Sequence, residues 1–478
     1  MTLNHTVPAA STTQWKDGKR YLWLIGLVVP SLAFIGYGMH ALTGWGVWFW
    51  IGPIVILVVV PAIDLVAGLD RSNPPDDVIE ALEKDRYYRW ITYLFLPIQY
   101  AGFVGAFWLI ASGDLSVADR VGLAVSIGCI GGIGINTAHE LGHKRESHER
   151  WLSKIALAQS FYGHFYIEHN RGHHVRVATP EDPASSRVGE SFYQFWPRTV
   201  LGSLRSAWNL EKRRIARRGQ HPFRLGNDVL NAWLMSVVLW GAMVLVLGLG
   251  ILPYLVIQAV VGFSLLEVVN YMEHYGMRRQ RTGPDGTGRY ERVDPSHSWN
   301  SNNIATNVLL YHLQRHSDHH ANPTRRYQTL RDFQESPVLP TGYAGMIVLA
   351  LLPPLWRRVM DPRVRAHFGG DLSRANISPG KRDRILAAYP SPVVEPASPV
   401  VELVETRVST SSTDGVDGEV LAARCPGCGY TYEVASGEER EGFAAGTAWA
   451  DIPDAWCCPD CGVRDKVDFV TLVQATLD

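Results

Sequence analysis

Six long, mostly apolar stretches fall within the first 270 residues of this 478-residue chain. About 20 apolar residues in a helix cross the ~30 Å hydrocarbon core of a bilayer, and in lipid the backbone must satisfy its own hydrogen bonds. The sequence therefore predicts an all-α integral membrane body with six transmembrane helices, of which the fourth and sixth have polar ends. The predicted spans are Tyr21–Leu42, Val47–Val66, Ile91–Ala111, Arg120–Ile135, Val229–Leu249 and Ile251–Val269.

Loop charge gives these spans an orientation. The loops at 40–45, 112–118 and 248–252 contain no Lys or Arg, whereas the opposite ends carry basic residues such as those at 212–214. Because cytoplasmic loops are enriched in Lys and Arg, we expect both termini to be cytoplasmic in a bacterial-type inner (plasma) membrane. The first apolar run lacks a signal-peptide cleavage pattern. A seventh stretch, Tyr343–Trp356, is too short to span and is interpreted as interfacial or re-entrant.

The end of the chain differs in composition from this body. Five of the six cysteines lie beyond residue 424, which indicates a metal site in a reducing compartment. Residues 421–478 carry a net charge of −6 and the rest of the chain +5, so the two parts have opposite sign. Between them, residues 390–420 are rich in Pro, Ser and Thr and predict a flexible linker. We therefore expect a membrane domain at 1–389, a linker at 390–420 and a small domain at 421–478.

Nine histidines occur in four tight clusters at one side of the predicted membrane. They are His139, His143, His169, His173, His174, His274, His316, His319 and His320. One metal ion takes about four such ligands, so nine imidazoles predict two ions, and imidazole suits iron, zinc and copper. Helical residues four apart share a face. We therefore expect His139 to pair with His143 and His169 with His173, while His174 reaches the other ion and His319 and His320 divide between the two.

Carboxylates accompany every cluster, and a ligating histidine usually donates its second N–H to such a group. The candidates for that role are Glu140, Glu168, Glu273 and Asp318, and any of them is also a possible ligand. His312 is a further candidate for a supporting role. His164, His297 and His312 lie close to the clusters and are interpreted either as packing residues or as groups that support the ligands. Isolated histidines are interpreted as surface residues: His5, His40, His148, His221 and His367.

The segment His139-Glu-Leu-Gly-His143 also matches the H-E-x-x-H signature of zinc proteases. An intramembrane zinc metalloprotease is thus an alternative. It would need one further ligand and would leave six histidines without a role, so we do not favour it.

Two Cys-x-x-Cys motifs near the C-terminus predict a tetrahedral iron or zinc site made by Cys425, Cys428, Cys458 and Cys461. A zinc ribbon is the structural alternative. The aromatic residues and the motifs Cys425-Pro-Gly-Cys-Gly-Tyr430 and Gly446-Thr-Ala-Trp-Ala-Asp-Ile-Pro453 closely resemble rubredoxin, a one-iron electron carrier with a small metal-bound β fold. Cys457 departs from that pattern and is interpreted as a spare thiol.

The body also resembles a known family. The four histidine boxes, with Asn270-Tyr-Met-Glu-His-Tyr-Gly276 and Ser298-Trp-Asn-Ser-Asn302, resemble the integral-membrane alkane 1-monooxygenases over residues 15–385. That resemblance implies a non-haem diiron centre held by the nine histidines, fed by rubredoxin, which is fused here. It implies hydroxylation of the terminal methyl of an n-alkane to a 1-alkanol with O2, so alkane, O2 and lipid are the expected partners.

The sequence also gives expectations about cofactors, partners, the substrate channel and competing functions. No dinucleotide-binding fingerprint is present, so we expect no bound flavin or NAD, and a separate FAD-dependent NAD(P)H:rubredoxin reductase supplies electrons; no nucleic-acid partner is expected. The basic segment 212–218 either guides docking of the acidic domain or meets anionic lipid. Ile56 is a candidate for the substrate channel, which would admit medium to long alkanes. The competing functions are a fatty-acyl desaturase or hydroxylase, a xylene-type methyl monooxygenase, and an iron-binding redox sensor without turnover.

Overall fold

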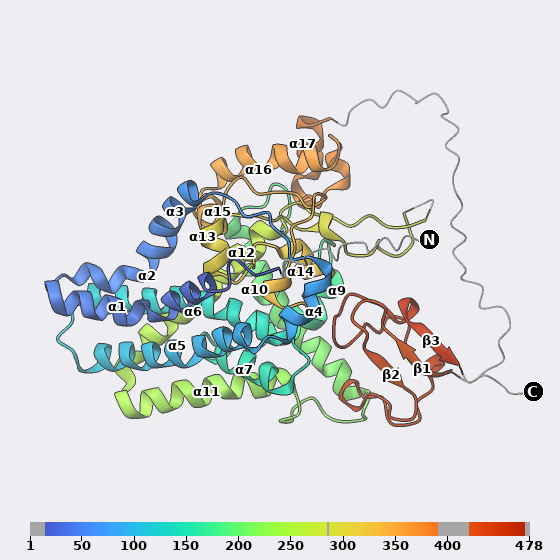
Figure 1. The fold of residues 1–478 in the computed structure, drawn as a ribbon, viewed down its shortest axis with the longest axis horizontal. Coiled ribbons are helices and arrows are strands. Elements are labelled where there is room, and N and C mark those ends of the chain that lie inside the picture. Colours follow the sequence, from blue (N-terminus) through green and yellow to red (C-terminus); the bar gives the residue numbers. More distant parts are fainter. Residues whose placement is uncertain (1–14, 284–285, 391–419, 474–478) are drawn as a thin grey trace, which may run out of the picture.

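The computed structural model describes residues 15–283, 286–390 and 420–473. Within these ranges a large helical body carries a small β domain at one end (Figure 1). The longer elements are α1 (Val28–Thr43), α5 (Arg86–Ser112), α6 (Val117–Gly142), α7 (Ser147–Ala158), α10 (Phe192–Ala216), α11 (Asp228–Leu247), α12 (Leu252–Glu273) and α16 (Pro353–His367). The shorter elements are α2 (Ile51–Ile54), α3 (Val60–Ala67), α4 (Asp76–Lys84), α8 (Phe165–Glu168), α9 (His174–Arg176), α13 (Ile304–Leu309), α14 (His316–Ala321), α15 (Tyr343–Ala350), α17 (Arg382–Ala388), β1 (Val420–Arg424), β2 (Thr431–Glu433) and β3 (Val470–Val473).

Six helical stretches in the described residues are long and apolar enough to cross a membrane, which confirms the predicted number. The spans are Leu22–Thr43, Gly46–Ala67, Arg86–Ser112, Val117–Gly142, Asp228–Leu247 and Leu249–Glu273. The fourth and sixth extend further than expected, because their polar ends stay helical inside the protein. As a result, His139 lies on the fourth span itself, close to its C-terminal end.

The fourth span, α6, is the central helix of the bundle, and nine tenths of its most apolar window is buried. It packs against α12 through small residues. A β-carbon at Gly132 would lie 2.9 Å from the Gly262 carbonyl oxygen, and one at Gly128 would lie 2.7 Å from the Val261 β-carbon. Small residues let helix backbones approach closely in membranes, so this pairing fixes the ends of both helices, where two of the histidine boxes lie.

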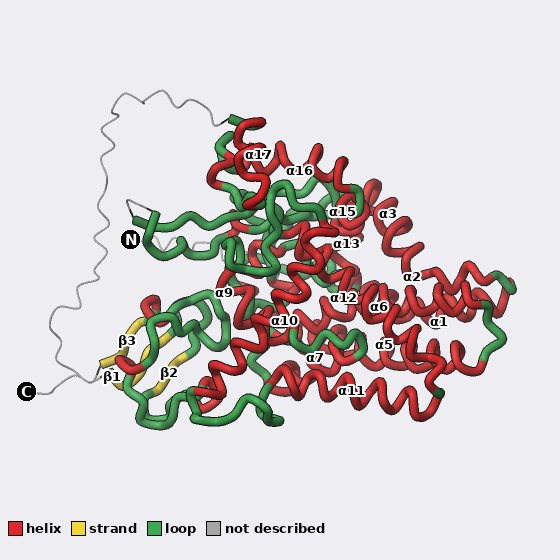
Figure 2. The backbone as a smooth tube through the Cα atoms, turned by 180° about the vertical axis from the view of Figure 1, so that it is seen from behind, coloured by secondary structure: helices red, strands yellow, loops and turns green. Residues whose placement is uncertain are grey.

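Beyond the ends of α6 and α12, short helices and loops form a second layer next to the β domain (Figure 2). This layer contains α8, α9 and α14, whereas α7 packs along α6 and α13 packs against α3. The stretch 343–356 forms the eight-residue α15 followed by α16, and α15 is too short to cross a bilayer. Its side chains Tyr343, Met346 and Ile347 are buried in a core cluster shared with Val269 and Met272 of α12.

The C-terminal domain is an antiparallel sheet of order β2-β1-β3. Its core is aromatic, built from Tyr432, Phe443, Trp449, Trp456 and Phe469 around three buried cysteines. The predicted linker lies almost entirely at 391–419, outside the described residues.

Candidate metal centres

The fold gathers the nine histidines into two groups, although they come from four separate parts of the chain. In each group the nearest side-chain nitrogens lie within 4.8 Å of one another, and all nine residues are buried. The first group contains His139, His143, His169, His174 and His319. The second contains His173, His274, His316 and His320. The predicted division of His319 and His320 between two positions agrees with this grouping.

The expected pairing of His169 with His173 is wrong. His169–His173 forms a π-helical turn, so the chain there is wound more widely than an α-helix. His169 therefore lies next to His174, five positions on, with their Nε2 atoms 3.1 Å apart. His173 turns to the second group, where its Nε2 lies 3.3 Å from that of His320. Such single turns are frequent at functional sites, and this one divides three neighbouring histidines between two positions.

The nitrogen atoms of both groups are arranged as metal ligands would be. The Nε2 atoms of His139 and His319 are 2.9 Å apart, and those of His316 and His320 are 2.8 Å apart. A neutral imidazole offers one lone pair, and burial, followed by neighbouring histidines, lowers the pKa of His319 and His320 well below the ordinary value. The buried Nε2 of His143 has no hydrogen-bond partner among the described residues. Neutral lone pairs thus converge on two points, which fits a histidine-ligated diiron site.

One carboxylate that accepts from a clustered histidine is not among those expected. Asp182, fully buried after the second histidine box, lies 2.9 Å from His173 Nδ1 and also accepts from Ser185. Nδ1–H donation to this carboxylate leaves the His173 Nε2 lone pair free for a metal. Because Asp182 lies nine residues away in an irregular Pro-rich turn, helical spacing gave no sign of it.

Three of the four expected carboxylates have other contacts. Glu140 contacts Lys144 and the Tyr327 amide, Glu168 pairs with Arg176, and Asp318 pairs with Arg325. Glu273 differs, because its Oε2 lies 3.2 Å from His316 Nε2, the nitrogen directed at the second group. Its carboxylate therefore borders the second group, which consists of His173, His274, His316 and His320.

Of the two roles predicted for His312 and His164, packing near the clusters or support of the ligands, their contacts fit packing. His312 Nδ1 lies 2.9 Å from the Tyr327 carbonyl oxygen, and its Nε2 lies 3.3 Å from Lys19 Nζ. His164 is buried against Tyr162 and Trp233, and within the described part of the chain neither of its ring nitrogens has a hydrogen-bond partner. Neither histidine belongs to the two groups.

The four cysteines of the C-terminal domain also converge. Cys425 and Cys461 Sγ atoms are 3.8 Å apart, and those of Cys428 and Cys458 are 3.6 Å apart. Two loops supply them, the first knuckle (Cys425–Gly429) and the second knuckle (Cys458–Gly462). Cys457 stays outside the group, and its thiol contacts Asp465 at 3.1 Å. Four thiolates in this arrangement suit a tetrahedral iron or zinc ion.

An apolar cavity leads from the membrane helices to the histidines. Aliphatic side chains such as Val29, Ile56 and Val60 line it within the bundle. At its other end lie His139 and His169 of the first group and His316 of the second. The cavity therefore offers an apolar molecule a path from the bilayer region to both candidate metal positions.

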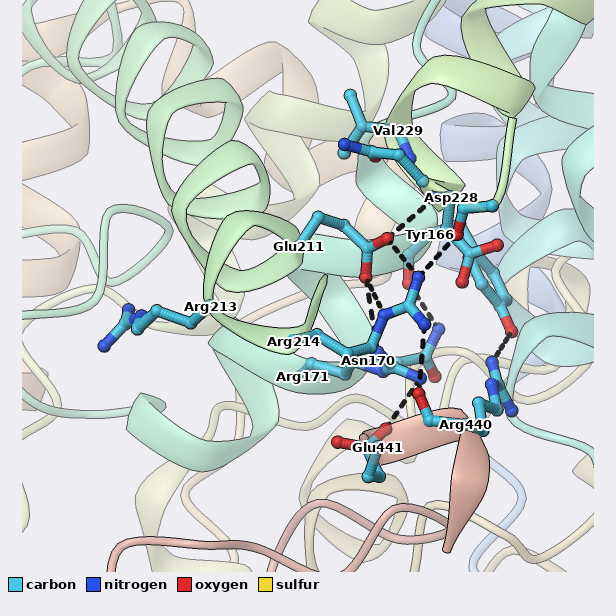
Figure 3. Close-up of polar contacts among 12 residues, drawn as sticks. Tyr166, Asn170, Arg171, Glu211, Arg213, Arg214, Asp228, Val229, Arg440 and Glu441 are labelled. Carbon is cyan, nitrogen blue, oxygen red and sulfur yellow. Dashed lines mark hydrogen bonds and ion pairs between the residues drawn. The ribbon is translucent and has the colours of Figure 1, made fainter. Parts of the chain in front are cut away.

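The β domain packs against the body through ion pairs centred on Glu441 (Figure 3). This buried carboxylate lies 3.0 Å from Arg171 and 3.2 Å from Arg217, while Arg217 also donates to its carbonyl oxygen at 2.7 Å. Burial raises the pKa of Glu441, but Arg171, Arg217 and Arg440 outweigh burial and hold it below the ordinary value.

Neighbouring residues extend this docking face. Arg214 is held by Glu211 and donates to the Arg440 carbonyl oxygen at 3.0 Å, while the Arg440 guanidinium donates to Tyr166 at 3.1 Å (Figure 3). At one edge, Arg145 pairs with Asp460 at 3.0 Å. Within the basic segment 212–218, Arg214 and Arg217 thus contact the acidic domain. Docking of that domain was one of the two roles predicted for this segment.

The second knuckle closes the docking face opposite the second histidine box, His169–His174. A β-carbon at Gly462 would lie 2.7 Å from the Asn170 carbonyl oxygen and 3.5 Å from the His174 β-carbon. The glycine has φ of +68°, which also favours glycine there. The backbone next to Cys461 therefore packs against Asn170 and His174, and His174 belongs to the first histidine group.

Comparison with known proteins shows which family has this combination of domains. Residues 120–350 match the fatty acid desaturase family and residues 422–469 match rubredoxin. An alkane 1-monooxygenase of Acinetobacter baylyi is 47% identical over 389 residues, which cover 80% of this chain and 94% of that protein. The chain belongs to the alkane 1-monooxygenase family.

Further relatives agree with this placement. An alkane 1-monooxygenase of Pseudomonas putida is 45% identical over 379 residues, covering 79% of this chain and 94% of the relative. A xylene/toluene monooxygenase hydroxylase component of the same species is 26% identical over 375 residues, covering 76% and 92%. The chain is thus a multi-pass membrane member of the alkane 1-monooxygenase family with a C-terminal rubredoxin domain. Its cysteine group fits a rubredoxin iron site.

Proposed function

We propose that this protein hydroxylates the terminal methyl group of medium- to long-chain n-alkanes, with O2 as the oxidant and electrons delivered by its rubredoxin domain. Each turnover consumes one alkane, one O2, two electrons and two protons and gives one 1-alkanol and one water. The observation that carries this proposal is the apolar cavity that ends at His139, His169 and His316.

The nine histidines would hold two iron ions in the two groups, and Cys425, Cys428, Cys458 and Cys461 would hold a third. A bound iron pair supplies O2 reduction and C–H oxidation. The chain's own residues orient the substrate and exclude water. The aliphatic lining admits an alkyl chain lengthwise, so its end meets the histidines first. Selectivity for the terminal methyl then follows from where the alkane lies in the cavity. The internal C–H bonds are weaker, but they stay further from the histidines than the terminal methyl does.

The direct test of the function is product analysis on the purified full-length chain. We expect NADH-dependent formation of 1-alkanols when octane through hexadecane are supplied with a rubredoxin reductase. The fatty acid desaturase match at 120–350 makes a desaturase the second candidate. Alkenoyl products from fatty-acyl substrates, without alcohol from alkanes, would support that candidate and contradict ours.

Replacing Ile56 by Trp is expected to shorten the longest alkane accepted. Ile56 is 5% exposed and lines the cavity, so the larger indole would occupy the space of several methylenes. One methylene in an apolar pocket changes discrimination by roughly 10- to 200-fold. We therefore expect at least ~10-fold loss of kcat/KM on hexadecane with octane less affected, measured by chromatography of the alcohols.

Val58→Trp is the matched control, because Val58 is two residues away and 62% exposed on the outside of the same span. It should leave the chain-length profile unchanged. An unchanged profile in Ile56→Trp, or an equal shift in Val58→Trp, would remove Ile56 from the substrate path.

Two further parts of the proposal concern the setting of the enzyme. We place it in the inner membrane of a bacterial cell with both termini cytoplasmic, since the loops at 40–45, 112–118 and 248–252 lack Lys and Arg.

The electron source is a separate flavin-dependent rubredoxin reductase that oxidises NAD(P)H. The rubredoxin domain carries single electrons and has no means of its own to accept a hydride, which supports this assignment.

A further inference from the structure

The two knuckles of the rubredoxin domain face different surroundings. The second knuckle turns toward the body, with Gly462 buried against Asn170 and His174 and Asp460 paired with Arg145. This side of the domain also carries Glu441 and Arg440. Electrons that leave through the second knuckle would thus arrive directly at the turn that holds His169, His173 and His174.

The first knuckle stays open while the domain is docked. Its tip residues Pro426 and Gly427 are exposed, and Cys428 is the one cysteine of the group that is not buried. The Cys428 carbonyl oxygen accepts from Arg145, so the knuckle is held at its edge while its tip faces outward. The metal position therefore has one side against the body and one side accessible to another protein.

Two arginines flank this open tip. Arg464 lies against Gly427, where an added β-carbon would be 3.2 Å from the Arg464 Cγ, and Arg424 lies against Gly429 at 3.4 Å. They are two of only four basic residues among residues 421–478, a segment with a net charge of −6. The third, Arg440, is committed to the docking face, and the fourth, Lys466, donates to backbone carbonyls of its own domain. Two of the four basic residues of this segment thus flank the exposed knuckle.

We propose that the rubredoxin domain is loaded while it stays docked: a reduced electron-donor protein with an acidic surface binds at the first knuckle between Arg424 and Arg464, and electrons leave through the second knuckle. The proposal rests on the function proposed above and adds the binding surface of the donor. The alternative is a shuttle, in which the domain must leave the body to be reduced.

Each passage moves one electron. Reduced flavin in the donor would lose one electron, and iron held by Cys425, Cys428, Cys458 and Cys461 would take that electron up and become ferrous. It would return to the ferric state on passing the electron to iron held by the histidine groups. Two such passages supply the two electrons of one turnover, and the protons come from water.

The test follows the loading step alone. The full-length chain with ferric cysteine-bound iron is mixed anaerobically, without alkane, with NADH and a purified rubredoxin reductase, and loss of the ferric–thiolate absorption is followed. We expect Arg424→Glu/Arg464→Glu to slow loading at least ~10-fold at low salt, with the defect shrinking as salt rises. Dithionite, a small reductant, should reduce this variant at the normal rate.

Two further variants change residues at the contact between the rubredoxin domain and the body. Arg292→Glu makes the same substitution at an exposed residue that pairs with Asp468, and Glu441→Gln weakens docking itself. Both should load within about twofold of the unmodified chain. Normal loading of Arg424→Glu/Arg464→Glu, or equal slowing with dithionite, would overturn the entry surface, and severalfold faster loading of Glu441→Gln would establish the shuttle instead. Because neither alkane nor O2 is present, these outcomes do not depend on the hydroxylase activity.

Discussion

His169→Ala is expected to abolish alcohol formation and to remove iron from the helical body. His169 lies in the first group, 3.1 Å from His174 between Nε2 atoms, and it borders the apolar cavity. Loss of a residue that merely supports a ligand costs roughly 10- to 100-fold in metal affinity or activity, so loss of a ligand should cost more than ~100-fold. Turnover with decane and iron per chain are the measurements.

The control for this change is His221→Ala, because His221 is exposed in the loop before α11 and belongs to neither group. It should keep full activity and iron. In His169→Ala the absorption of the cysteine-bound iron should also persist, which shows that the chain has folded. Normal iron content together with normal turnover in His169→Ala would show that this histidine is not a ligand.

Glu441→Lys is expected to disconnect the rubredoxin domain from the hydroxylase. The carboxylate is 6% exposed and lies between Arg171 and Arg217, so a lysine there would place a third cation in a buried cluster. Breaking a buried ion pair costs about 3–5 kcal/mol, although the tether keeps the local concentration high. We expect at least a ~10-fold slower reoxidation of pre-reduced cysteine-bound iron when decane and O2 are added, with alcohol yield falling in parallel.

Glu439→Lys provides the same change of charge two residues away, at an exposed position with no ion pair to the body among the described residues. Its reoxidation rate should stay within about twofold of the unmodified chain. Equal rates in the two variants would mean that the domain delivers electrons without the docking face centred on Glu441.

The membrane spans and the candidate metal-binding residues were predictable from the sequence, because both depend on residue type and spacing. The six apolar runs, the nine histidines and the four cysteines can all be read from the chain, and the structure gathers them as groups. The fourth span exceeds its predicted end because hydropathy falls at Asn136 while the helix continues to Gly142. Polar residues there are shielded by protein, a condition that a hydropathy pattern does not contain.

The division of histidines between the two groups was not predictable in the same way. An α-helical period pairs His169 with His173, but the π-helical turn shifts the phase by one residue and pairs His169 with His174. Whether a helix widens at one turn depends on tertiary packing. The same holds for Asp182, whose contact with His173 arises from an irregular loop, and for Glu441, whose partner Arg171 lies 270 residues earlier inside a histidine box.

The central claim is that two iron ions lie in the histidine groups and a third in the cysteine group. Elemental analysis of the purified full-length chain, combined with the same analysis of His169→Ala, tests it most directly. We predict three irons per chain, with at least one lost in the variant and the cysteine-bound iron retained. Zinc in place of iron, or a single ion in the helical body of the active, unmodified protein, would contradict the account.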